Sequence, residues 1–134
     1  MHVQPYVFFD GRCEEAIDFH KNAIGAEVGM LMHWKDSPDK SMCSPDNADK
    51  VMHAQFNVGD TTIMASDGRN TGNPNFQGFA LTINANDAAE VDRLFNALGE
   101  SGKVTMPLSK TFFSERFGML ADKFGVNWML IVAK

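Results

Sequence analysis

Histidines are the side chains of this chain that are best suited to acid-base or metal chemistry. His53 is a candidate general base beside Gln55 and Ser66, because an unperturbed imidazole titrates at about pH 6.5. His33 and His53 could also supply two metal ligands if their strands pair, although a hydrogen-bonding role at a surface or cavity wall is the more usual one. His20 falls at a core position of a predicted helix, where we expect it to pack as an aromatic ring would.

Cysteine chemistry depends on where the thiols lie. Cys13 follows Arg12 at the start of a predicted helix, where the cation and the helix dipole would lower the thiol pKa. Glu14 and Glu15 would raise it again, so a reactive thiol and a small packing residue both stay open. Cys13 and Cys43 stand in unlike contexts, which is not the pattern of a disulfide-stapled domain, and we expect both to be free.

Composition and missing motifs exclude several classes of partner. A net charge of −5 with dispersed Lys and Arg argues against nucleic acid. No apolar run approaches the ~20 residues that span a bilayer, and the N-terminus lacks signal-peptide features, so we expect a cytoplasmic protein. The sequence has no phosphate-binding glycine loop, no nucleophile elbow and no metal-spaced His-Glu motif. A small molecule is the expected partner.

Hydrophobic periodicity and turn residues predict the elements that position these side chains. The first half reads as a strand at 3–9, a helix ending at Gly25, and strands at 26–34, 51–58 and 61–66. The second half reads as a strand at 76–84, a helix between Asp87 and Gly99, a short strand at 103–106, and a closing hairpin within 113–132. The polar stretch 35–50 is a long loop and a candidate lid.

The order strand, helix, strand, strand, strand thus occurs twice. The two predicted helices share a local signature, Asn22-Ala23-Ile24-Gly25 and Asn96-Ala97-Leu98-Gly99. We therefore predict an α+β fold, a single domain over 1–134 built from tandem βαβββ modules at 1–69 and 74–134. Their strands would form one curved mixed sheet around a cavity.

The turn Gly59-Asp60 fixes the register of the predicted hairpin in the first module. It pairs Val58 with Thr61, Gln55 with Met64 and His53 with Ser66. One face of the hairpin is then mostly polar and should line the cavity: His53, Gln55, Asn57, Thr62, Met64 and Ser66. The other face is apolar and belongs beneath a helix: Ala54, Phe56, Val58, Ile63 and Ala65.

The closing hairpin carries the most specific motif, Phe117-Gly118 followed by Asp122, Phe124-Gly125-Val126 and Trp128. This hairpin resembles that of PhnB-like proteins, members of the vicinal oxygen chelate superfamily together with glyoxalase I and the bleomycin-resistance proteins. Matches at 4–17, 53–54 and 63–67 extend the resemblance over the whole chain. The resemblance implies the same paired βαβββ fold.

Metal-dependent relatives carry their ligands on the cavity side of the first and last strands of each module. The resemblance places Pro5, Met64, Phe79 and Met129 there, and none of them is a histidine or carboxylate. Gln4 or Tyr6 would not restore the site, and a thioether is too soft for Zn, Ni, Fe or Mn. We therefore expect no cofactor and disfavour a divalent metal.

Two functions follow from the resemblance. The first is a small-molecule binding or resistance protein that works as a homodimer without metal. Its ligand would contact His53, Gln55, Asn57, Met64, Ser66, Phe79 and Met129. The alternative is a metal-dependent lyase, isomerase or dioxygenase. Some relatives carry a ubiquinone methyltransferase label, but no glycine loop for S-adenosylmethionine follows a strand here. A purely structural dimer explains the polar cavity face poorly.

Overall fold

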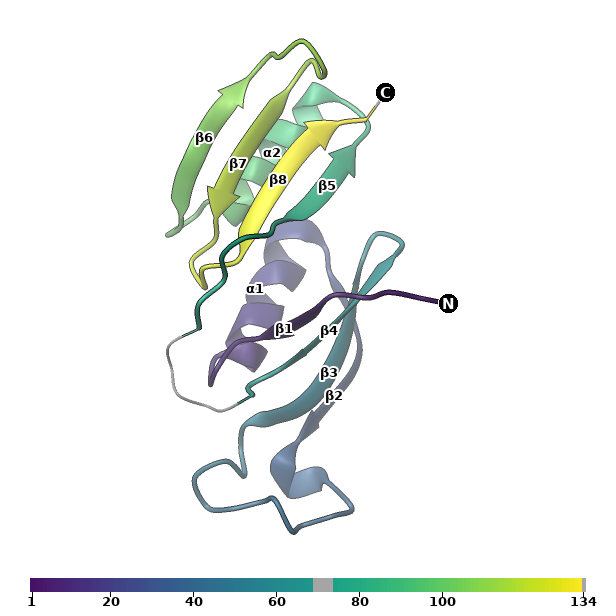
Figure 1. Cartoon of the computed structure of the whole chain (residues 1–134), viewed down its shortest axis with the longest axis vertical. Coiled ribbons are helices and arrows are strands. Elements are labelled where there is room, and N and C mark those ends of the chain that lie inside the picture. Colours follow the sequence, from purple (N-terminus) through teal and green to yellow (C-terminus); the bar gives the residue numbers. More distant parts are fainter. Residues whose placement is uncertain (69–73, 134) are drawn as a thin grey trace. The chain divides into compact units, whose positions relative to one another are not determined.

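The computed structural model describes residues 1–68 and 74–133, which form two compact units, Met1–Pro74 and Asn75–Lys134 (Figure 1). Each unit has the order strand, helix, strand, strand, strand, and each builds its own four-stranded mixed sheet. The predicted α+β class and the twofold βαβββ repeat are therefore confirmed. No helix in the described residues is long and apolar enough to cross a bilayer.

The first unit contains one mixed sheet and one long helix. Its elements are β1 (Tyr6–Phe8), α1 (Cys13–Ile24), β2 (Glu27–His33), the 3-10 helix η1 (Trp34–Asp36), β3 (Val51–Val58) and β4 (Thr61–Ser66). The strand order is β1-β4-β3-β2, and β1 runs parallel to β4. Helix α1 ends as predicted, because Gly25 adopts φ 70° and donates its N–H to the last-turn carbonyls.

The hairpin of β3 and β4 has the predicted register. Val58 pairs with Thr61 and Gln55 with Met64, whereas the regular ladder ends at Ala54 and Ala65, one step before the predicted His53–Ser66 pair. Phe56 is 2% exposed and its ring stacks on that of His20 in α1, with centroids 6.1 Å apart. The apolar face of the hairpin thus lies beneath α1, and His20 packs as an aromatic ring does.

The second unit repeats this plan. Its elements are β5 (Leu81–Ala85), α2 (Ala88–Leu98), β6 (Lys103–Ser109), β7 (Phe117–Ala121) and β8 (Asn127–Val132), in the sheet order β5-β8-β7-β6. Reciprocal capping starts α2: Asp87 Oδ1 accepts from Glu90 N at 2.8 Å, and Glu90 Oε1 accepts from Asn86 N at 3.0 Å. The helix buries Val91, Leu94, Phe95 and Leu98, the residues that the periodicity indicates.

Asp122 organises the turn of the closing hairpin. Its Oδ1 accepts from the backbone N–H groups of Phe124 and Val126, and its Oδ2 accepts from Trp128 Nε1 at 2.9 Å. The carboxylate is 3% exposed, so these donors replace the water it would otherwise bind. This geometry accounts for the spacing of Asp122 and Trp128 in the hairpin, because one carboxylate accepts from donors on both sides of the turn.

Three predicted strand limits are wrong. The strand predicted at 76–84 begins only at Leu81, because Gly78 at φ 84° interrupts the extended backbone, and Phe79 therefore lies outside the sheet. The first strand is shorter than 3–9 and covers Tyr6–Phe8. Strand β6 continues past Met106 to Ser109, since Pro107 is tolerated in a strand at the edge of its sheet.

Candidate functional site

The face of the first sheet that is turned away from α1 combines polar, aromatic and thioether side chains. The register pairs Tyr6 with Met64, Met30 with Gln55, and Met32 with His53, which places all six on this side. We call this surface the open face, and its members are Tyr6, Phe8, Met30, Met32, His53, Gln55, Asn57, Thr62, Met64 and Ser66. It contains every face residue predicted from the hairpin, together with four that the hairpin alone could not indicate.

Tyr6 and His53 form the central polar pair of the open face. The Tyr6 hydroxyl lies 3.0 Å from His53 Nδ1, and the two ring centroids are 5.6 Å apart. Phe8 lies beside Tyr6, with centroids 4.8 Å apart. The predicted neighbours of His53 were Gln55 and Ser66, so Tyr6 was missed. The signal available in the sequence was the alternation of Tyr6, Val7 and Phe8, which places both aromatic rings on the side of the strand opposite Val7.

The other predicted ligand-binding residues of the first unit occupy different places. Gln55 and Met64 pair at the centre of the open face. Asn57 lies toward the hairpin end, where its Oδ1 accepts from Thr62 Oγ1 at 2.7 Å. Ser66 is 4% exposed, and its Oγ accepts from Gly68 N at 3.2 Å, so its hydroxyl supports the turn after β4.

Two predicted residues belong to the second unit. Met129 pairs with Met119 and with Thr82, on the side of its sheet opposite the buried Trp128 and Leu130. Phe79 is 53% exposed and precedes β5, so it holds no register position in this sheet.

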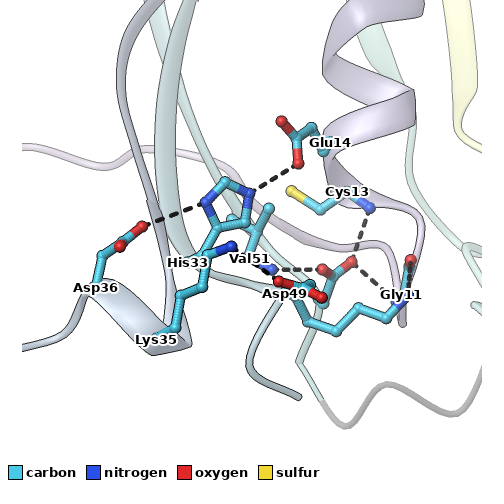
Figure 2. A network of polar contacts seen from close by, with 10 residues as sticks. Gly11, Cys13, Glu14, His33, Lys35, Asp36, Asp49 and Val51 are labelled. Carbon is cyan, nitrogen blue, oxygen red and sulfur yellow. Dashed lines mark hydrogen bonds and ion pairs between the residues drawn. The ribbon is translucent and has the colours of Figure 1, made fainter. Parts of the chain in front are cut away.

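His33 contacts carboxylates, whereas His53 contacts Tyr6. Figure 2 shows His33 between Glu14 and Asp36. Glu14 Oε1 lies 2.8 Å from His33 Nε2, and Asp36 Oδ2 lies 3.5 Å from His33 Nδ1. The hydrogen bond to Glu14 is the main cause that raises the pKa of His33. The two histidines thus have separate partners, and the structure supports the surface role for His33 over a shared metal site.

A buried carboxylate closes the N-terminus of α1. Asp67 Oδ1 accepts from the N–H groups of Gly11 and Cys13 at 2.9 and 2.7 Å, and Oδ2 accepts from that of Val51 at 2.7 Å. Cys13 is fully buried, and burial followed by the charge of Asp67 raises the pKa of its thiol. Cys13 is therefore a packing residue rather than a reactive thiol. Both cysteines, which lie within the described residues, are free.

The donor set on the first and last strands of each unit does not suit a hard or borderline divalent ion. The register corrects two of the four predicted positions, because Tyr6 faces Met64 and Thr82 faces Met129, in place of Pro5 and Phe79. A phenol, a hydroxyl and two thioethers supply no imidazole or carboxylate. Among residues 1–68 and 74–133, no group of three or more His, Cys, Asp or Glu could hold a metal ion.

Comparisons with known proteins place the chain among close relatives. A family model described as 3-demethylubiquinone-9 3-methyltransferase matches residues 1–131. Protein YjdN of Escherichia coli is 32% identical over all of this chain and 97% of its own length. Protein PA1353 from Pseudomonas aeruginosa has 37% identity and a TM-score of 0.87, covering 98% of this chain and 97% of that one.

Two further structures bear on the fold. A putative 3-demethylubiquinone-9 3-methyltransferase, PhnB protein, from Bacillus cereus has 27% identity and a TM-score of 0.83, covering 99% of this chain and all of that one. The fosfomycin resistance protein FosX from Mesorhizobium loti has 14% identity and a TM-score of 0.60 over all of this chain and 92% of its own. This second likeness concerns the fold alone, which is that of the vicinal oxygen chelate superfamily.

Proposed function

Since the chain belongs to the PhnB-like family described as 3-demethylubiquinone-9 3-methyltransferase, we propose that it binds a small organic molecule on the open face of its first sheet. Protein side chains, rather than a metal ion, hold the ligand. The composition of the open face is the observation that carries this proposal. Ligand sites combine an apolar lining with a few placed polar groups, and here thioethers and aromatic rings surround the Tyr6–His53 pair.

The exposure of the two faces supports the same proposal. Ala54, Phe56 and Ile63 are at most 3% exposed beneath α1, whereas His53, Gln55 and Met64 on the opposite side remain partly accessible. A histidine and an amide at the centre of a sheet face can hydrogen-bond a ligand without a large desolvation cost, because they are not fully buried.

Methyl transfer, which the family description names, has less support from these residues. A helix N-terminus is a common site for the anionic groups of a nucleotide-like cofactor. The N-terminus of α1 is occupied by Asp67, and that of α2 by Asp87 and Glu90. We therefore propose binding of an organic ligand, without a methyl-transfer step.

Metal and ligand titrations on chelator-treated protein test this function. We expect small aromatic compounds to shift amide resonances of the open face, and zinc, nickel, manganese and ferrous iron to bind only weakly. His53→Ala should weaken binding of oxygen-bearing ligands. Stoichiometric sub-micromolar binding of a divalent ion that disappears in His53→Ala would instead support the alternative, a metal-dependent lyase, isomerase or dioxygenase.

A further inference from the structure

The two units place corresponding residues at the same register positions. In the first sheet, Gln55 pairs with Met64, and Met64 pairs with Tyr6. In the second, Met119 pairs with Met129, and Met129 pairs with Thr82. Both edge strands also shift register at the same point, between Val28 and Met30 in β2 and between Val104 and Met106 in β6. Gln55 and Met119 therefore hold equivalent places.

His53 and Phe117 are then equivalent, since His53 stands two residues before Gln55 and Phe117 stands two residues before Met119. In the second unit, the chain supplies an aromatic ring here: Phe113 packs edge-on against Phe117, with centroids 5.2 Å apart and planes at 73°. Phe117 is only 5% exposed although it lies on the face opposite α2. This position of the fold thus accepts an aromatic ring in contact with the sheet.

In the first unit, the same position is polar. His53 Nδ1 contacts the Tyr6 hydroxyl. In the second unit, Thr82 takes the register position of Tyr6, and Phe117 takes that of His53. A neutral phenol that donates to Nδ1 leaves the imidazole proton on Nε2. Within the described part of the chain, no hydrogen bond uses His53 Nε2. The pair can therefore offer an N–H donor next to the apolar side chains of Met32 and Met64.

We propose that the ligand of the open face is a planar aromatic molecule that carries a hydrogen-bond acceptor oxygen. Its ring packs beside His53, at the place that Phe113 takes in the second unit, and its oxygen accepts from His53 Nε2–H. Tyr6 is a positioning residue that fixes the tautomer of His53. This inference rests on the proposed function and specifies the class of ligand.

A matched pair of probes tests it: acetophenone, which has a carbonyl oxygen, and α-methylstyrene, which has a CH₂ group in its place. Amide shifts of ¹⁵N-labelled full-length protein give the dissociation constants and the location of each probe. We expect acetophenone to bind about threefold to tenfold more tightly, the usual effect of one neutral hydrogen bond, with shifts centred on β1, β3 and β4.

Two variants separate the donor from the ring. His53→Phe keeps an aromatic ring, as Phe117 does in the second unit, and should bind both probes equally. Tyr6→Phe keeps its ring but loses the hydroxyl. The ¹⁵N shifts of the His53 imidazole should then indicate a mixture of tautomers in place of the Nε2–H tautomer alone, and the preference for acetophenone should fall. His2→Phe makes the same substitution as His53→Phe at an exposed residue outside any strand, and should leave the preference unchanged.

The possible outcomes are distinct. Equal binding of the two probes to the unaltered protein, with shifts on the open face, overturns the donor role of His53 and leaves the proposed function standing. Binding of neither probe overturns both. A preference that survives His53→Phe also refutes the inference. Phe113→Ala provides an independent check, because removing this ring should create a second site near Phe117 that binds α-methylstyrene at least as well as acetophenone.

Discussion

The Glu14 carboxylate lies 2.8 Å from His33 Nε2 and so joins the first turn of α1 to the end of β2. Asp36 contacts the other ring nitrogen at 3.5 Å, from the 3-10 helix that begins the 35–50 loop. The imidazole is 22% exposed, whereas both carboxylates are more than half exposed. His33 thus links three consecutive parts of the first unit at a partly solvated site.

This contact predicts a weak pH dependence of stability. The pKa of His33 is raised in the fold, chiefly by the hydrogen bond to Glu14. The contribution of this contact to the free energy of unfolding is therefore complete below the unfolded pKa of about 6.5 and is lost as pH rises through the folded pKa. Exposure of Glu14 limits the effect to below about 1 kcal/mol. In NMR titrations, Glu14→Gln should lower the pKa of His33. An unchanged pKa would show that Glu14 is not its main partner in solution.

Asp67→Asn should destabilise the first unit strongly. The carboxylate accepts hydrogen bonds from three backbone N–H groups. In the Asn side chain, an NH₂ group replaces one carboxylate oxygen and would face a backbone N–H that has lost its acceptor. We expect a loss of about 2–4 kcal/mol in the free energy of unfolding, measured by urea denaturation. Asp46→Asn, at an exposed loop residue, is the matched control and should change stability by less than about 0.5 kcal/mol. Similar losses in both variants would contradict the role of the buried carboxylate.

Gly102 and Gly29 should respond differently to alanine. A Cβ at Gly102 would collide with the backbone oxygen of Ala121 and lie 3.0 Å from Asp122 Cα, whereas one at Gly29 would meet only Gln55 O at 3.7 Å. The equivalent of Gly29 in the second unit is Thr105, which already carries a Cβ. Urea denaturation should therefore show a loss above about 2 kcal/mol for Gly102→Ala and below about 1 kcal/mol for Gly29→Ala. The reverse order would show that the backbone at Gly102 can adjust.

We also predict that the protein is a homodimer. Phe112 is 95% exposed and Phe8 53% exposed, and aromatic side chains of this kind are enriched at protein interfaces. Sedimentation equilibrium at micromolar concentration should give twice the chain mass of 14.8 kDa. Phe112→Ser and Phe8→Ser, made separately, test which of the two contributes to the association. A species of about 15 kDa at every concentration would remove the dimer from consideration.

Local sequence signals predicted most of the fold. The two-residue turn at Gly59-Asp60 determined the β3–β4 register, because a tight turn leaves no freedom for the residues that flank it. Helix limits followed from Asp87 and Gly25, whose capping chemistry lies within a few residues of each end. These interactions join residues that are near in sequence, so their patterns are visible without the fold.

The missed features depend on distant pairing. Tyr6 and His53 are separated by 47 positions and meet through the parallel pairing of β1 with β4, for which no local turn sets a register. Phe79 was misplaced because the sequence pattern predicts one strand over 76–84, whereas the backbone at Gly78 interrupts it and β5 begins only at Leu81. The burial of Ser66 follows from its bond to Gly68 and from the Asp67 contacts beyond it, neither of which alternation alone can indicate.

The shifts of register in β2 and β6 also bear on aggregation. Both are outer strands of their own sheets, and both expose apolar side chains, Val28 and Met30 on one and Val104 and Met106 on the other. A straight apolar strand at a sheet edge can add further strands from other molecules without limit, whereas a local irregularity increases twist and interrupts the row of backbone donors and acceptors. The repeated irregularity thus hinders open-ended strand addition at this edge of each sheet. Variants that restore regular pairing should reveal such addition as fibrils or turbidity.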